Sequence, residues 1–251
     1  MKQILKTAPP PVLTHYVRTH RNLSWEKFSR PENASIKGVL GDWLRAEQGF
    51  LCCYCEEEIA KGVCHIEHFK PKSYFPELAL DYTNLFASCN GCGTKEDLTC
   101  GMKKRNLYFP SLISPADPTC ETRFLFTADG QILPVDEKDD RGWETIALLG
   151  LNSPKLRRRR EMVYQELLNL RTLFSPEDFR HYVRIRLEKS AKGRFCEFWT
   201  TVRYFGEDGT PDETLASARI SEAESTLESP DPESPEMAAT EKTQTTNRPP
   251  K

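Results

Sequence analysis

The chain of 251 residues lacks any run of about 18 apolar residues, which a membrane-spanning helix requires. Its first residues, from Met1 to Pro9, also lack the apolar stretch of a secretory signal peptide. We therefore predict a cytoplasmic protein with no membrane segment. Disulfides are rare in the cytoplasm, and nine cysteines cannot all pair within one chain, so the cysteines are interpreted as metal ligands or buried thiols.

The chain also has little net charge, −2 at neutral pH, but this charge is unevenly distributed. Residues 207–251 carry eleven acids and four bases, so the first 206 residues carry 31 bases against 26 acids, a net charge of +5. This excess favours an anionic partner, although a solvated helical face gives the same balance. Residues 207–251 also lack aromatic side chains and are rich in Ser, Thr, Pro and acids, which predicts a disordered acidic tail.

The first half of the chain is predicted to combine one helix with two short extended elements. Apolar residues at helical spacing predict a helix over residues 35–48, and three consecutive prolines at 9–11 predict an extended N-terminus. Residues 63–69 alternate as in a strand, which a following Lys-Pro pair ends. A second short element is expected after Asn84.

The second half is predicted to contain a small β-hairpin and a helical bundle. Residues 123–135 fit the hairpin, because an Asp-Gly pair at their centre supplies the positive φ of a tight turn. Helical periodicity begins at Arg141, and Ser153 and Ser175 each offer an N-cap followed by a favoured first-turn proline. A last helix is expected around residues 195–202. The fold class predicted for the whole chain is therefore α+β.

Two Cys-x-x-Cys pairs, Cys52/Cys55 and Cys89/Cys92, have the spacing of zinc knuckles. A structural zinc ion takes four thiolate or imidazole ligands in a tetrahedron, and two such pairs supply all four. Cys100 follows shortly after the second pair and is an alternative fourth ligand. The other cysteines have no partner spacing and are interpreted as structural: Cys53, Cys64, Cys120 and Cys196.

An acid beside a histidine, Glu67-His68, lies between the two cysteine pairs and precedes Asn84. A hydrolytic nuclease needs a general base that activates water and a divalent cation that polarises the phosphate. Adjacent side chains of a regular strand point to opposite faces, so these two act together only where the strand ends. His65 shares a face with Glu67, and both can approach a cation. An isolated histidine near cysteines is also interpretable as a zinc ligand or a surface residue.

The order Cys-x-x-Cys, Glu-His, Asn, Cys resembles the HNH endonucleases, and further segments are similar to the HNH nucleases of retron and Septu phage-defence systems. These segments are Trp25–Phe28, Gly41–Gln48, Cys55-Glu56, His65–Ser73, Asp81–Leu85, Cys100-Gly101 with Lys103-Lys104, and Leu148–Asn152. The resemblance covers roughly residues 1–175 and is to the PtuB-type effector. It implies a zinc-stabilised ββα-metal (HNH, or His-Me finger) core that cleaves phosphodiester bonds. It also implies an ATPase partner of the ABC/SMC type and, in retron versions, a reverse transcriptase with its DNA–RNA product.

The resemblance assigns His68 as the general base and Glu67 as a ligand of a catalytic Mg²⁺ or Mn²⁺. It assigns Asn84 as a catalytic-site residue that fixes the loop and the orientation of the histidine. Relatives place a histidine shortly after the Cys-Gly pair, where this chain has Met102, and a thioether is a poor ligand for a hard cation. Three residues are alternatives for the missing ligand: Asn90, Asn106 and His65. A metal held by fewer protein groups and more water is a further alternative. The same resemblance favours Cys100 as the fourth ligand of a structural Zn²⁺, beside Cys52, Cys55 and Cys89, whereas spacing alone favours Cys92.

Basic residues near this cluster are expected to contact nucleic-acid phosphates, and they are Lys70, Lys72, Lys103, Lys104 and Arg105. A second basic run, residues 155–160, is interpretable in the same way or as a partner of acidic side chains. No pattern indicates contacts to base edges, so the sequence does not distinguish DNA from RNA, tRNA included.

These patterns divide the chain into four parts: 1–50, an N-terminal extended segment and helix; 51–122, the nuclease core; 123–206, a hairpin and helical region for partner docking; and 207–251, the tail. The predicted function is a metal-dependent HNH endonuclease, the effector of a retron or Septu anti-phage complex. The alternative is a non-catalytic zinc-knuckle adaptor that binds nucleic acid or tethers the ATPase, and Met102 favours it.

Overall fold

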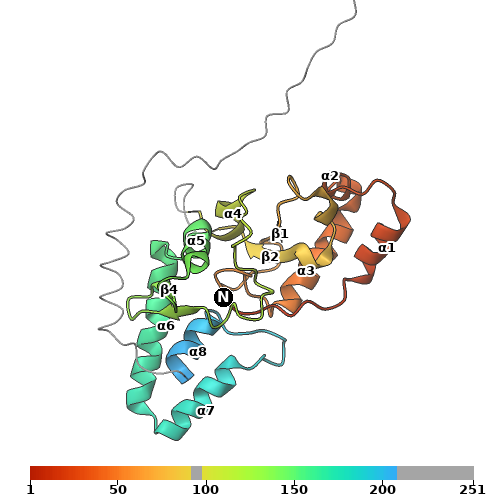
Figure 1. Ribbon diagram of the computed structural model, residues 1–251. Helices are drawn as coiled ribbons and strands as arrows, with labels where there is room; N and C mark the ends of the chain where they lie inside the picture. The colour runs from red at the N-terminus through yellow and green to blue at the C-terminus, as the bar shows by residue number, and fades with distance from the viewer. Residues whose placement is uncertain (92–97, 208–251) are drawn as a thin grey trace, which may run out of the picture. The chain divides into compact units, whose positions relative to one another are not determined.

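The computed structural model describes residues 1–91 and 98–207 (Figure 1). The predicted disordered tail lies outside these residues apart from Glu207, and so does Cys92. In the described ranges, helices and two small antiparallel sheets give a mixed α+β fold, as predicted. No helix in these ranges is both long and apolar enough to cross a membrane.

Three helices precede the cysteines: α1 (Pro11–Thr19), α2 (Trp25–Phe28) and α3 (Ala34–Glu47). The prediction of α3 is confirmed within one residue at each end. The prediction of an extended N-terminus is wrong for residues 11–19, because Pro11 occupies the first turn of α1, where a fixed φ and a missing N–H cost nothing. A 3-10 turn at Pro31–Asn33 leads into α3.

The central sheet consists of β1 (Cys64–His68) and β2 (Leu85–Cys89), paired antiparallel with Cys64 opposite Cys89 and His68 opposite Leu85. Two 3-10 turns, Pro76–Leu78 and Tyr82–Asn84, lie in the connection between them. The short helix α4 (Cys100–Lys104) contacts β2. The strand predicted at 63–69 is confirmed, and the second element is a strand.

Helix α3 is fixed to this sheet by the buried amide of Gln48. Its nitrogen donates to the carbonyls of Leu51 and Ala87, each at 2.8 Å, and its oxygen accepts from the N–H of Ala87 at 2.7 Å. Leu40 and Leu44 of α3 are fully buried in the same core as Phe86 of β2. One side of the sheet is therefore covered by the N-terminal helices.

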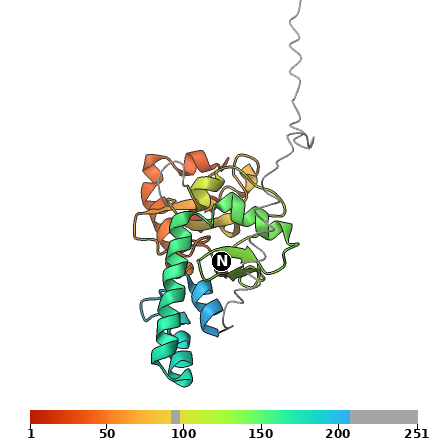
Figure 2. The same ribbon diagram turned by 90° about the vertical axis from the view of Figure 1, so that its left-hand side faces the viewer.

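The remaining elements are β3 (Phe124–Phe126), β4 (Ile132–Pro134), α5 (Asp140–Leu149), α6 (Pro154–Leu173), α7 (Pro176–Leu187) and α8 (Trp199–Glu207). Strands β3 and β4 pair antiparallel, which confirms the hairpin. Helix α8 packs against α6 and α7, and it lies beside the long α6 in Figures 1 and 2. Ser175 caps α7 by accepting from the N–H of Asp178 at 3.1 Å, whereas Ser153 makes no such bond at the start of α6.

Candidate functional site

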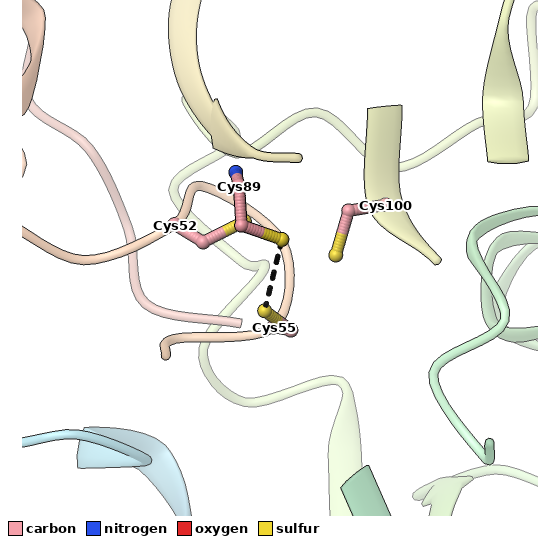
Figure 3. A group of neighbouring side chains, drawn as sticks. All are labelled: Cys52, Cys55, Cys89 and Cys100. Atoms are coloured by element: carbon pink, nitrogen blue, oxygen red, sulfur yellow. Dashed lines mark hydrogen bonds between the residues drawn. The ribbon is translucent and has the colours of Figure 1, made fainter. Parts of the chain in front are cut away.

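Four cysteine thiols from three separate segments form one cluster (Figure 3). The sulfurs of Cys52, Cys55, Cys89 and Cys100 all lie within 4.8 Å of one another. Those of Cys55 and Cys89 are 3.8 Å apart, the separation of two tetrahedral ligands that each lie about 2.3 Å from one zinc ion. The cluster therefore fits a metal ion such as zinc. Among the described residues Cys100 supplies the fourth thiol, whereas the alternative from spacing, Cys92, lies outside them.

Each segment holds its cysteines by local backbone structure. Cys52 and Cys55 lie in a tight turn closed by the bridge between Leu51 and Glu58. Cys89 is the last residue of β2, and Cys100 is the first of α4, with a positive φ of 56°. A side chain in this left-handed region costs about 1–3 kcal/mol, which the bond to a metal would offset. The cluster thus ties α4 to the end of the sheet.

A cavity of about 250 Å³ lies beside this cluster, between the end of β1 and helix α4. Side chains of His65, Glu67 and His68 line it from β1, and Gly101 and Met102 line it from α4. Strand β1 ends at His68, where neighbouring side chains are no longer held to opposite faces. The three residues predicted from the strand therefore meet at one cavity.

The imidazole of His68 is held in one tautomer. Its Nε2 lies 3.0 Å from the carbonyl oxygen of Ala79, which only accepts, so Nε2 carries the proton and Nδ1 carries the lone pair. The indole of Trp25 packs edge-on against the ring, with centroids 4.3 Å apart. Burial lowers the pKa of His68 to about 4, and the cation of Lys72 adds to this against the opposing effect of the Ala79 carbonyl. At neutral pH the imidazole is an uncharged base.

The carboxylate of Glu67 is buried and makes three polar contacts. Its Oε1 lies 2.8 Å from the ammonium of Lys104 and accepts from the Tyr54 hydroxyl at 3.1 Å, and its Oε2 accepts from His65 Nε2 at 3.1 Å. Burial alone raises the pKa of Glu67, but the hydrogen bond from His65 and the charge of Lys104 outweigh it, so the pKa lies below its ordinary value. Glu67 is therefore ionised, and its charge is already balanced by a lysine.

Lys104 belongs to the site, but not in the role predicted from the sequence. Its side chain is fully buried, and its ammonium also donates to the backbone carbonyl of His68 at 2.9 Å. It therefore cannot reach a phosphate, and the prediction that it binds nucleic acid is wrong. Lys104 instead links Glu67 to His68.

A divalent cation could replace the proton that His65 Nε2 shares with Glu67 Oε2, since both atoms would then present lone pairs to it. The separation of 3.1 Å between Nε2 and Oε2 is close to that of adjacent ligands in an octahedron with bonds of about 2.1 Å. Within the described chain, Nδ1 of His65 is buried with no hydrogen-bond partner, so the ring is incompletely satisfied as it stands. A Cβ at Gly101 would lie 2.4 Å from both donor atoms, so only glycine leaves room for them.

Asn84 holds the loop that follows β1. Its side-chain oxygen accepts from the N–H of Lys70 at 2.8 Å, and its nitrogen donates to the carbonyls of Lys70 at 3.0 Å and Leu78 at 3.3 Å. The loop role implied by the resemblance therefore has a direct geometric counterpart. Of the alternative third ligands, Asn106 lines the cavity, whereas Asn90 is exposed after β2 and is not among the lining residues.

The remaining basic candidates differ in position. Lys72 and Arg105 are exposed and line the cavity, so both can meet an anion there. Lys70 is half-buried, with its ammonium 5.6 Å from the centre of the Phe75 ring, and Lys103 is exposed outside the cavity lining.

The basic run at 155–160 is largely structural. Arg159 pairs with Glu57 at 2.8 Å and Glu197 at 2.7 Å, which joins α6 to the cysteine turn. The buried guanidinium of Arg160 donates to the backbone carbonyl of Gly130 at 2.7 Å. Of the two interpretations from sequence, pairing with acidic side chains is confirmed for Arg159, although its partners were not foreseen.

No family model matches the chain. It is 32% identical over 195 residues to the "Retron Vc95 putative HNH endonuclease" of Vibrio cholerae serotype O1 biovar El Tor, which covers 74% of this chain and 92% of that protein. It is also 32% identical over 105 residues to the "Retron Ec83 putative HNH endonuclease" of Escherichia coli, and over 104 residues to the "Septu protein PtuB" of Bacillus thuringiensis. These two matches span 41% and 36% of the relatives and about two fifths of this chain. With a third of the residues identical along nearly the whole Vibrio protein, the chain belongs to the HNH endonucleases of the retron and Septu type.

Proposed function

We propose that this chain is a nuclease that hydrolyses phosphodiester bonds in nucleic acid, with Mg²⁺ or Mn²⁺ at the cavity and Zn²⁺ at the cysteine cluster. The supporting observation is the state of His68, a neutral imidazole at the cavity with Nε2 engaged by Ala79 and its lone pair on Nδ1. A general base requires such a lone pair within reach of the attacking water.

Each residue of the cavity has a separate role in the proposed reaction. His68 takes a proton from water at Nδ1, and the Ala79 carbonyl stabilises the resulting imidazolium through Nε2–H. Lys72 and Arg105 hold the phosphate, and Asn84 keeps the loop beside β1 in place. A divalent ion held by Glu67 and His65 would polarise the phosphate and stabilise the leaving oxygen.

The fold that we propose for the core is the ββα-metal finger implied by the relatives' names, formed by β1, β2 and α4. We further propose that residues 51–122 form the nuclease core and that residues 123–206 dock a partner. An ABC/SMC-type ATPase and, in a retron, a reverse transcriptase with its DNA–RNA product are the proposed partners of a cytoplasmic defence complex. Support comes from relatives whose names place them in retron and Septu systems.

The test is cleavage by the protein reconstituted with its genomic neighbours, using His68→Ala and a titration of Mg²⁺ and Mn²⁺. Loss of a general base lowers the rate by about 10²–10⁴. Zinc content and thermal unfolding of the variant are measured in parallel, so that a folding defect is recognised. Cleavage that survives His68→Ala at the wild-type rate would rule out this assignment.

A second function, that of a non-catalytic adaptor, is favoured by two features of the cavity. Met102 lines the cavity from α4, and Glu67 is already neutralised by Lys104. Wild type that is inert in every divalent metal, together with no gain of cleavage in Met102→His, would support the adaptor.

A further inference from the structure

A second and larger cavity adjoins the first one at β1. It has a volume of about 760 Å³ and is bounded by Trp25 of α2, by residues of α3 and by the segment from Lys61 to Ile66. His65 and Ile66 line both cavities, so the two meet at β1. We call this second cavity the α3 groove.

The charge of the α3 groove suits a polyanion. Arg30, Lys37 and Lys61 line it, and no ion pair is found for any of them in the described chain. Within residues 1–91 and 98–207, Asp42 is the one acid in the lining, and its carboxylate is bound to the buried guanidinium of Arg45 at 2.7 Å. The lining of the groove is therefore net positive, because the carboxylate of Asp42 is already paired with Arg45.

An aromatic face and unsatisfied polar atoms accompany these charges. The half-buried Trp25 lines the groove, and the ammonium of Lys37 lies 5.5 Å from its ring centre. The hydroxyl oxygen of Ser29 and Nδ1 of His65 belong to lining residues, and both are buried without a hydrogen-bond partner in the part of the chain described. A stacking surface beside cations is the composition of single-strand binding sites.

We propose that the α3 groove binds the single-stranded nucleic acid that flanks the scissile phosphate, so that a strand passes from the groove over His65 into the catalytic pocket. Trp25 then has two contacts, one with a base in the groove and one with the ring of His68. This inference rests on the proposed nuclease function for the position of the scissile phosphate, but binding in the groove is measured without cleavage.

Gly38 allows the groove to be blocked without disturbing the fold. It is a helical residue of α3 that lines the groove, and a Cβ added to it meets no described atom within 4 Å. Glutamate is also a better helix former than glycine. Gly38→Glu therefore places bulk and negative charge in the groove. Ala46→Glu adds the same charge to an exposed position of α3 outside the groove and is the matched control.

The experiment uses the full chain carrying His68→Ala and fluorescence anisotropy with short single-stranded DNA, single-stranded RNA and duplex DNA as probes. Gly38→Glu is expected to weaken single-strand binding by about tenfold or more, because it opposes like charges, while Ala46→Glu changes it by less than about twofold. Replacing Arg30, Lys37 and Lys61 by Gln should lower the slope of log K against log salt by about 2, at about 0.7 per phosphate contact.

Each outcome decides the proposal. Equal affinity with and without Gly38→Glu overturns it, as does the absence of salt-dependent binding by the parent chain. An effect confined to the duplex overturns the single-strand assignment. If wild type cleaves no nucleic acid but Gly38→Glu still weakens binding, the nuclease proposal fails and the groove stands. If wild type cleaves and the groove variants bind like the parent, the groove proposal is refuted and the nuclease proposal is not.

Discussion

The buried ammonium of Lys104 provides the sharpest test of how the cavity between β1 and α4 is built. It lies 2.8 Å from Oε1 of Glu67 and donates to the carbonyl of His68 at 2.9 Å, with no exposed surface. Lys104→Met keeps the length of the side chain and removes its charge. The perturbation therefore leaves a buried carboxylate without its cation.

Removing one partner of a buried ion pair costs about 3–5 kcal/mol, because the other charge stays buried and uncompensated. With a urea dependence of about 2 kcal/mol per molar, the unfolding midpoint should fall by about 2 M. Glu67→Gln combined with Lys104→Met removes both charges and should recover much of this loss. Lys103→Met alters the neighbouring exposed lysine of the same helix and should change stability by less than about 0.5 kcal/mol.

The loss of stability caused by Lys104→Met should increase as the pH rises. In wild type the pKa of Glu67 is lowered, so its contribution to stability is present above the unfolded pKa and is lost as the pH falls. In Lys104→Met the His65 hydrogen bond still opposes the effect of burial, but loss of the cation moves the folded pKa of Glu67 upward from its wild-type position. The variant therefore loses stability relative to wild type as the pH rises. The difference between the two proteins should therefore grow from pH 5 to pH 8, by up to about 1.4 kcal/mol per pH unit.

The assay is urea unfolding followed by tryptophan fluorescence, in zinc-containing buffer without other divalent ions, at several pH values. Effects of pH on the thiol cluster are common to both proteins and cancel in the difference. A loss below 1 kcal/mol at neutral pH, or a difference independent of pH, would refute the ion pair as the element that organises the cavity.

Three further predictions concern single positions. Cys100→Ser should remove zinc and lower the melting temperature, whereas Cys120→Ser should keep one zinc per chain by atomic absorption, because only the first thiol belongs to the cluster. Gly101→Ala should abolish tight Mn²⁺ binding in calorimetry, since its Cβ would lie 2.4 Å from the two candidate ligand atoms, and unchanged affinity would contradict the assigned site. Ser175→Ala should lower the free energy of unfolding by about 1 kcal/mol, because the cap of α7 is lost. Ser153→Ala should be neutral or stabilising, because this buried hydroxyl has no partner among the described residues. Equal losses in thermal unfolding would contradict this pair of predictions.

The elements that local pattern predicts well are those whose signals are also local. The hairpin at 123–135, helix α3 and the capped start of α7 follow from turn chemistry, periodicity and an N-cap serine. Helix α1 was missed because three prolines favour extended chain until the last of them occupies a helical first turn. Proline is compatible with both an extended segment and the first turn of a helix, and only the residues that follow it distinguish the two.

Composition alone does not indicate which of the adjacent basic residues is buried and which are exposed. Lys103, Lys104 and Arg105 are adjacent and equally charged, yet the middle one is buried and its neighbours are exposed. A signal was present in the spacing, because Lys104 follows Cys100 by one helical turn and shares its face. A thiol that binds the cluster must face inward, so the lysine four residues later faces inward as well.

Helix α4 connects the cysteine cluster and the cavity within five residues. Cys100 contributes a thiol to the cluster, Gly101 packs against Glu67 Oε2 and His65 Nε2, and Lys104 neutralises Glu67 at Oε1. An isolated helix of this length is unstable in water, so its position depends on what anchors its ends. Loss of the cluster would release the first end and free Lys104 from the carboxylate. Zinc at the cysteines is therefore expected to govern the charge balance of a cavity that it does not line.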